Sequence, residues 1–202
     1  MRPQLEEREV KAVVPDPALL RRHVLESGGL STFRGFMEDR LFDRDGELAG
    51  RGEVLRVRTW RPDGGVPTTQ LAWKGLTRRS SEGHKLREEL ESDVAGDGSA
   101  VGRLFEALGY RVSGGIDRFV EVFELGAAVI RIEWYPRMDV LVEVEGTPDA
   151  IDGAVAATAL PPGAFLPESL PEFVQRFEGR TGERAALCVA DLRGDPPAWT
   201  RR

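Results

Sequence analysis

The feature that most constrains the fold is an alternation of charged and apolar residues that returns in successive segments. The apolar residues Leu55 and Val57, for example, alternate with two arginines. A period of two is typical of β-strands, because successive side chains of a strand point to opposite faces. The segments with charges on one parity contain Glu7, Glu9 and Lys11; Arg56 and Arg58; Lys85, Arg87, Glu89 and Glu91; Arg131 and Glu133; and Glu143 and Glu145.

The order of expected elements favours an antiparallel α+β sheet. About eight strands are predicted, over residues 5–14, 28–43, 52–60, 68–75, 82–92, 117–125, 127–136 and 138–146. About four helices are predicted, over residues 15–27, 98–110, 149–160 and 168–182. Asp16 and Pro17 suit the cap and first position of the first helix. These helices are too few to cross over between every pair of parallel strands, so a doubly wound sheet is disfavoured.

Length and composition indicate one domain and exclude several classes of protein. We expect a domain over residues 1–184 and a partly flexible tail over residues 185–202, within a length that suits one domain. A net charge of −6 argues against a general nucleic-acid binder, and no apolar run approaches the length of a membrane span. The single cysteine, Cys188, excludes an internal disulfide and is typical of a reduced, cytoplasmic setting. Two histidines leave little for a histidine-based zinc site.

The charged parity has two interpretations. It can be the solvated face of an open sheet, which is the usual habit of antiparallel sheets. It can also line the inside of a closed sheet whose apolar parity faces outward under helices. The second interpretation requires paired charges or a charged ligand, since bare buried charges are strongly unfavourable. The sorting of charges by sign favours a ligand that brings both metal and phosphate, because carboxylates hold Mg²⁺ or Mn²⁺ and arginines hold phosphate oxygens.

An ordered series of motifs resembles the CYTH proteins, also called triphosphate tunnel metalloenzymes. The opening EREVK, residues 7–11, fits the ExExK signature of that family. EDRLFDRDGELAGRGEVLRVR, LAWKG, REELES, DRF and IEWYPRMDVLVEVEG follow in the family's order. The resemblance covers residues 5–146 and implies an eight-stranded antiparallel barrel with a central tunnel and flanking helices. The family includes thiamine triphosphatases, inorganic triphosphatases and class IV adenylate cyclases.

The resemblance also implies roles for individual residues. Mg²⁺ or Mn²⁺ is the implied cofactor, with the ligands Glu7, Glu9, Glu133, Glu143 and Glu145. All of these except Glu133 are the implied catalytic residues, and Glu133 stands where the family usually has Asp. The implied triphosphate-binding residues are Lys11, Arg56, Arg58, Lys74, Arg87 and Arg118. Further candidates are Glu89, Arg131 and Lys85, and the family's C-terminal base would come from Arg176, Arg180 or Arg184.

We therefore expect a metal-dependent triphosphatase acting on inorganic triphosphate, thiamine triphosphate or a nucleoside triphosphate. The alternatives are a class IV adenylate cyclase and a non-catalytic module that binds polyphosphate or a phosphorylated ligand. The expected partner is the small-molecule substrate, with no nucleic acid and no membrane, in a monomer or homodimer. Asp39 and Asp43 could serve the site or cap turns, and one of Trp60, Trp73 and Trp134 could line a tunnel mouth.

Overall fold

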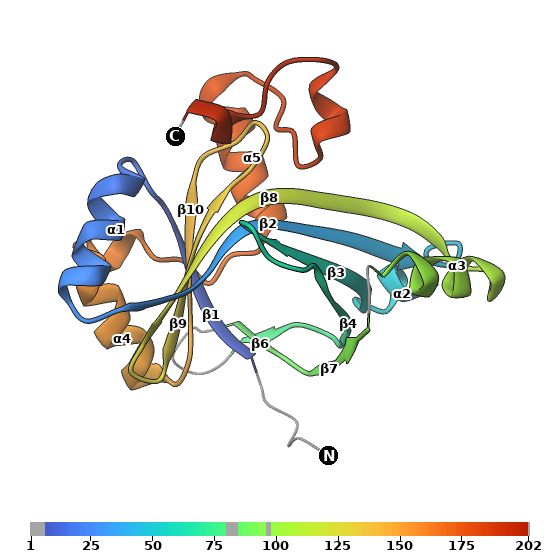
Figure 1. Ribbon diagram of the computed structural model, residues 1–202, viewed down its shortest axis with the longest axis horizontal. Helices are drawn as coiled ribbons and strands as arrows, with labels where there is room; N and C mark the ends of the chain where they lie inside the picture. The colour runs from blue at the N-terminus through green and yellow to red at the C-terminus, as the bar shows by residue number, and fades with distance from the viewer. Residues whose placement is uncertain (1–6, 80–84, 96–97, 202) are drawn as a thin grey trace.

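One antiparallel sheet of ten strand segments forms the body of the protein (Figure 1). The computed structural model describes residues 7–79, 85–95 and 98–201, with the backbone alone for residues 7, 79, 85 and 201. The strands are β1 (Glu7–Val13), β2 (Leu30–Asp43), β3 (Val54–Pro62), β4 (Thr68–Lys74), β5 (Arg78–Arg79), β6 (Lys85–Arg87), β7 (Glu89–Val94), β8 (Arg111–Leu125), β9 (Ala128–Trp134) and β10 (Leu141–Glu145). Their order in the sheet is β5-β6-β1-β10-β9-β8-β2-β3-β4-β7.

The sheet closes almost completely because β6 and β7 are two halves of one run of chain. β6 pairs with β1, and β7 pairs with β4, with only Glu88 between the two halves. At this break the backbone carbonyl of Glu88 accepts a hydrogen bond from the amide of Gly75 at 2.9 Å. Counted as one strand, β6 and β7 complete an eight-stranded antiparallel barrel, with β5 as a short addition beside β6. The predicted α+β barrel with flanking helices is confirmed.

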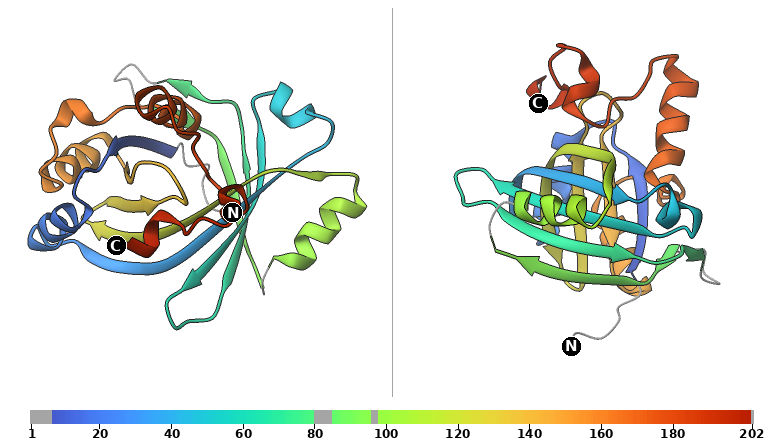
Figure 2. Two further views of the ribbon diagram at one scale, coloured as in Figure 1. Left: turned by 90° about the horizontal axis from the view of Figure 1, so that it is seen from above. Right: turned by 90° about the vertical axis from the view of Figure 1, so that its right-hand side faces the viewer.

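Helices flank the barrel on several sides (Figure 1). They are α1 (Pro17–Glu26), α2 (Glu47–Gly50), α3 (Ser99–Ala107), α4 (Pro148–Ala157) and α5 (Leu170–Thr181), with 3-10 turns at Pro162–Ala164, Val189–Leu192 and Ala198–Arg201. α1 and α4 lie side by side, and α3 lies on the opposite side of the molecule (Figures 1 and 2). In the described ranges, no helix combines the length and apolar character needed to cross a membrane.

Local signals explain where several of these helices begin and end. The Asp16 carboxylate accepts a hydrogen bond from the Leu19 amide at 2.9 Å and caps α1, as predicted. Ser169 and Glu172 form a capping box at the start of α5. The short helix α2 was not predicted, since its sequence shows only a turn at Asp45 and Gly46. The carboxylate of Asp43 stabilises it by accepting hydrogen bonds from backbone amides that include those of Leu48 and Ala49.

The apolar parity of the strands forms the outer wall of the barrel. Ile130, Ile132, Val142 and Val144 are fully buried and belong to one core cluster. The same cluster includes Leu20 and Val24 of α1 and Ile151 and Val155 of α4. The interpretation of a solvated charged face on an open sheet is therefore wrong, because the opposite parity turns inward.

One further element, β8, differs from the sequence expectations. β8 begins at Arg111, six residues before the predicted start, because the pair Gly114–Gly115 resembles a break but pairs with β2. The segment after α5 contacts the barrel: Ala186 exchanges backbone hydrogen bonds with Arg137 at 2.8 and 3.1 Å, and Trp199 is buried in the main core cluster. These contacts belong to the tail for which partial flexibility is expected.

Candidate functional site

Strand register brings the charged parity to one inner face. Lys11 of β1 lies opposite Glu143 of β10, and Glu143 lies opposite Arg131 of β9. Residues directly opposite each other on paired strands point to the same side of the sheet. The charges of separate strands therefore converge inside the barrel, around a cavity of about 610 Å³.

Almost all predicted site residues line this cavity. They are Glu9, Lys11, Arg56, Arg58, Lys74, Arg87, Glu89, Arg118, Arg131, Glu133, Glu143 and Glu145. Glu7 and Lys85 occupy β1 and β6, but their side chains lie outside the described part of the chain. Arg176, Arg180 and Arg184 are not among the described lining residues, and the first two pair with Glu168 and Asp139 on the surface. The predicted roles of these residues stay predictions.

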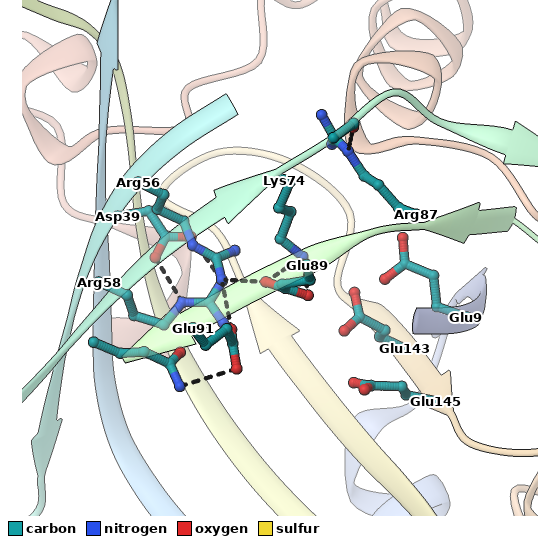
Figure 3. Close-up of polar contacts among 12 residues, drawn as sticks. Glu9, Asp39, Arg56, Arg58, Lys74, Arg87, Glu89, Glu91, Glu143 and Glu145 are labelled. Carbon is teal, nitrogen blue, oxygen red and sulfur yellow. Dashed lines mark hydrogen bonds and ion pairs between the residues drawn. The ribbon is translucent and has the colours of Figure 1, made fainter. Parts of the chain in front are cut away.

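Carboxylates from β1 and β10 form one side of the cavity (Figure 3). Lys11 Nζ bridges two of them, at 2.9 Å from Glu9 Oε1 and 2.7 Å from Glu143 Oε2. Arg131 Nη1 contacts Glu143 and also Glu145 Oε2, the latter at 2.8 Å. Burial alone would raise the pKa of Glu143, but the charges of Lys11 and Arg131 hold this pKa well below its usual value. Glu143 is therefore ionised near neutral pH.

Arginines gather around Asp39 on another side of the cavity (Figure 3). Asp39 is only 1% exposed, and its two oxygens accept hydrogen bonds from Arg58 Nε and Nη2 at 2.7 and 2.9 Å. Arg118 Nη2 donates to the same carboxylate at 2.8 Å. Burial alone would raise the pKa of Asp39, but Arg58 and Arg118 hold this pKa below its usual value. Asp39 therefore lies in the wall of the cavity, whereas Asp43 caps a turn.

A buried chain of contacts continues from Arg118. Arg118 Nε lies 3.3 Å from Glu133 Oε1, and the Tyr135 hydroxyl donates to Glu133 Oε2. Burial and the adjacent Glu133 carboxylate raise the pKa of Tyr135 well above its usual value, so the phenol keeps its proton. Tyr135 was missed in the sequence, although it shares the parity of Arg131 and Glu133. Asp39 and Tyr135 thus fix the orientation of neighbouring charged groups.

Arg56 is the least well partnered of the buried bases. Its Nη2 lies 3.3 Å from Glu89 Oε1 and 3.5 Å from Glu91 Oε1, which are long for charged hydrogen bonds. In the described structure, the buried Nε atoms of Arg56, Arg118 and Arg131 make no hydrogen bond. Burial, followed by repulsion from Arg58, lowers the pKa of Arg56. An anion near Arg56 would offset both the desolvation of its guanidinium group and the repulsion from Arg58.

The carboxylate oxygens of these acids are suitable ligands for a hard divalent cation, although they are not arranged as a complete coordination site. In the part of the chain that the structure describes, no three carboxylate, imidazole or thiol groups stand together as a metal site. Lys11 and Arg131 contact the acids instead. Mg²⁺ is commonly bound by only one or two carboxylates together with water and substrate phosphates. The three described glutamates therefore provide enough ligands of the right chemical type. The residues that would hold the metal are Glu9, Glu143 and Glu145, with Glu7 beyond the described side chains. The other predicted ligand, Glu133, contacts Arg118 and Tyr135, and its role as a ligand stays a prediction.

Two predicted phosphate ligands have other contacts. Arg87 donates hydrogen bonds to the backbone carbonyls of Gly75 and Gly52, the latter at 3.0 Å. Lys74 Nζ lies 3.0 Å from Glu89 Oε1. Both side chains line the cavity, but each already contacts another group of the protein there.

The fold matches several solved structures. No family model matches the sequence, and no curated protein matches it. A candidate adenylate cyclase from Vibrio parahaemolyticus superposes with a TM-score of 0.70 at 14% identity, over 85% of this chain and 99% of its own. A Pyrococcus horikoshii protein gives 0.68 at 19%, over 84% and 98%. A candidate adenylyl cyclase from Hippeastrum, HpAC1, described as having a dominant triphosphatase activity, gives 0.61 at 18%, over 91% and 99%. At these identities the likeness concerns the fold alone, and it agrees with the antiparallel barrel that the ordered motifs predict.

Proposed function

We propose that this protein is a metal-dependent phosphohydrolase that cleaves a terminal phosphoanhydride of a triphosphate. The observation that carries the proposal is the convergence of buried acidic and basic side chains on one cavity. Carboxylates from β1 and β10 gather on one side, and Arg56, Arg58 and Arg118 gather on another. Phosphoryl transfer requires mainly positioning and charge stabilisation, which such a cavity can supply without a histidine or cysteine nucleophile.

The charge balance of the cavity supports a requirement for metal. Its described lining includes seven basic and seven acidic side chains, so it is formally neutral. A triphosphate carries several negative charges, and its transfer into a neutral, partly dry cavity would be unfavourable without accompanying cations. Divalent ions held by Glu9, Glu143 and Glu145 would supply the missing positive charge. When bound, such an ion also lowers the pKa of a coordinated water and so provides a nucleophile.

The side chains would divide the remaining work between them. Arg56 has one unused buried donor, Nε, and would bind a phosphate oxygen through a charge-assisted hydrogen bond. Arg58 and Arg118 are held by Asp39 and would meet the phosphate chain without losing conformational freedom on binding. Lys11 lies between two carboxylates and would exchange one of them for a phosphate oxygen when a metal binds those carboxylates.

A substrate panel tests the proposal. Purified protein is supplied with inorganic triphosphate, ATP or thiamine triphosphate, with Mg²⁺, Mn²⁺ or EDTA, while orthophosphate, pyrophosphate and cyclic AMP are measured. We expect metal-dependent release of orthophosphate that EDTA abolishes. Cyclic AMP with pyrophosphate would identify a cyclase instead, and tight binding without any product would identify a binding module.

A pair of variants locates the activity in the cavity. Glu9→Gln should lower metal-dependent turnover by more than about 100-fold, the range seen when one stabilising group is removed from a polar site. Glu121→Gln is the matched control, because Glu121 is also buried but pairs with Arg21 and Arg34 on the outer face. Full activity in Glu9→Gln would contradict the assignment of the carboxylates.

A further inference from the structure

The charged side chains that line the cavity form a band around the inner face of the barrel, which we call the charged band. Apolar side chains lie on both sides of it. Along β2, Leu41 and Met37 flank Asp39 at intervals of two residues, so all three point inward. The two apolar ends differ, however, because Leu41 lines the cavity and Met37 does not. The two ends of the cavity are therefore not equivalent.

The Met37 end is packed by side chains. Met37 and Val120 are fully buried and form a cluster with Val122, against which Phe33 and Trp60 pack. The rings of Phe33 and Trp60 meet edge to face, with centroids 4.8 Å apart. Trp60 lines the cavity and also a shallower hollow of about 310 Å³ beyond it.

The opposite end is lined by apolar side chains that are at least partly exposed. This wall, which we call the apolar sector, consists of Leu41, Val54, Ile116, Leu170, Pro171 and Leu187. Leu41 lies directly opposite Arg56 in the β2–β3 register, so the sector begins beside the least well partnered base. A group attached to a phosphate held by Arg56 could reach this wall without leaving the cavity.

The C-terminal segment reaches the sector because β8 has a glycine where it passes. A Cβ at Gly115 would lie 2.9 Å from Cys188 Sγ, so a larger residue would push the segment away. Asp117 holds the segment in place: its amide donates to the Leu187 carbonyl at 2.7 Å, and its carboxylate accepts from the Val189 amide at 2.9 Å. These contacts place Leu187 at the cavity.

The sector offers little for hydrogen bonding. Of the described residues that line the cavity beside it, Ser169 has a polar side chain, and its hydroxyl donates to Glu172 Oε2 at 2.8 Å within the capping box. Reading the edge of a nucleobase requires several placed donors and acceptors. This wall instead suits apolar contact with a ring or chain.

We propose that the apolar sector binds the organic group of an organic triphosphate by shape and apolar contact, without reading hydrogen-bonding edges. The inference rests on the proposed function, since it assumes that the phosphate chain occupies the charged band. It also gives the substrate an orientation, with the organic group toward α5 and the terminal phosphate toward the charged interior.

Binding measurements on variants test this inference independently of turnover. Titration calorimetry with Ca²⁺ in place of Mg²⁺, under conditions in which no orthophosphate is released, compares ATP, UTP and inorganic triphosphate on wild type, Leu187→Ala and Leu170→Ala. We expect each variant to lower the ratio of ATP to triphosphate affinity by at least about tenfold, the lower end of the effect of one methylene lost from an apolar pocket. ATP and UTP should bind the wild type within about threefold of each other, because the edge of the base is not read.

Controls make the outcome decisive. Leu104→Ala on α3 changes a leucine that is 58% exposed and outside the cavity lining, and it should leave the ratio unchanged. Unchanged ratios in both sector variants would overturn the inference, as would a lower ratio in Trp60→Ala alone, which would place the organic group at the other end. Thermal melts establish that each variant is folded. If the protein binds these compounds but hydrolyses none of them, the proposed function is refuted. The inference about the apolar sector would then still be decided by the affinity ratios.

Discussion

Replacement of Asp39 by Asn is the sharpest test of the buried charge network. The change keeps the size of the side chain but removes the negative charge that Arg58 and Arg118 share. Loss of one partner from a well-buried ion pair costs about 3–5 kcal/mol, because the remaining charge is left uncompensated. The Asn carbonyl can still accept one hydrogen bond, so we expect a loss of about 3 kcal/mol in the free energy of unfolding.

That loss should appear in a thermal melt. For a chain of this size, 1 kcal/mol lowers Tm by about 2–4 °C, so Asp39→Asn should melt about 6–12 °C below wild type at pH 7. The pKa of Asp39 is lowered in the folded state, so its contribution is complete above the unfolded pKa of about 3.9 and declines as pH falls toward the folded pKa. The difference in Tm should therefore stay constant from about pH 8 to pH 5 and shrink below about pH 4.

An anion should restore part of the lost stability. Without Asp39 the cavity has an excess positive charge, so inorganic triphosphate in EDTA should raise Tm more in the variant than in wild type. Glu121→Gln is the control: Arg21 and Arg34 are 43% and 51% exposed, so water solvates them and the cost should be below about 1 kcal/mol. A drop in Tm of less than about 2 °C for Asp39→Asn, or an equal triphosphate effect in both variants, would refute the reasoning.

The remaining predictions concern a base, a bridge and the C-terminal segment. Arg56→Met should raise Tm in the absence of ligand, since burial and Arg58 disfavour the charge of Arg56, yet weaken triphosphate binding by about 100-fold in calorimetry; lower stability with unchanged affinity would contradict this. Lys11→Met should lower Tm because Glu9 and Glu143 lose their shared partner, and Mn²⁺ should restore Tm more than in wild type; a variant insensitive to Mn²⁺ would argue against these ligands. Trp199→Ala should cost about 3 kcal/mol of unfolding free energy in urea, because Trp199 is buried in the main core cluster; a cost below about 0.5 kcal/mol would mean that the segment is only loosely attached.

The strand pattern could be predicted from sequence because it depends on local geometry. Side chains alternate between two faces wherever a chain is extended, so Glu143 and Glu145 share a face whatever lies beside them. The alternation alone left open whether the charged face was solvated or enclosed, although Val142 and Val144 need an apolar covering. The order of motifs then indicated the barrel. Features without a periodic signal were missed, such as the short helix α2 and the start of β8 at a pair of glycines.

The sequence by itself therefore determined which side chains share a face, because the parity of a strand is a property of the chain alone. Only the tertiary structure decided which of them touch. Asp39 meets Arg58 and Arg118 because β2 lies between β3 and β8, and no spacing in the sequence specifies that neighbourhood. The apolar sector likewise joins Leu41, Ile116, Leu170 and Leu187, which are far apart along the chain. Contacts between distant segments depend on how the whole sheet closes, and that closure is a collective result of packing.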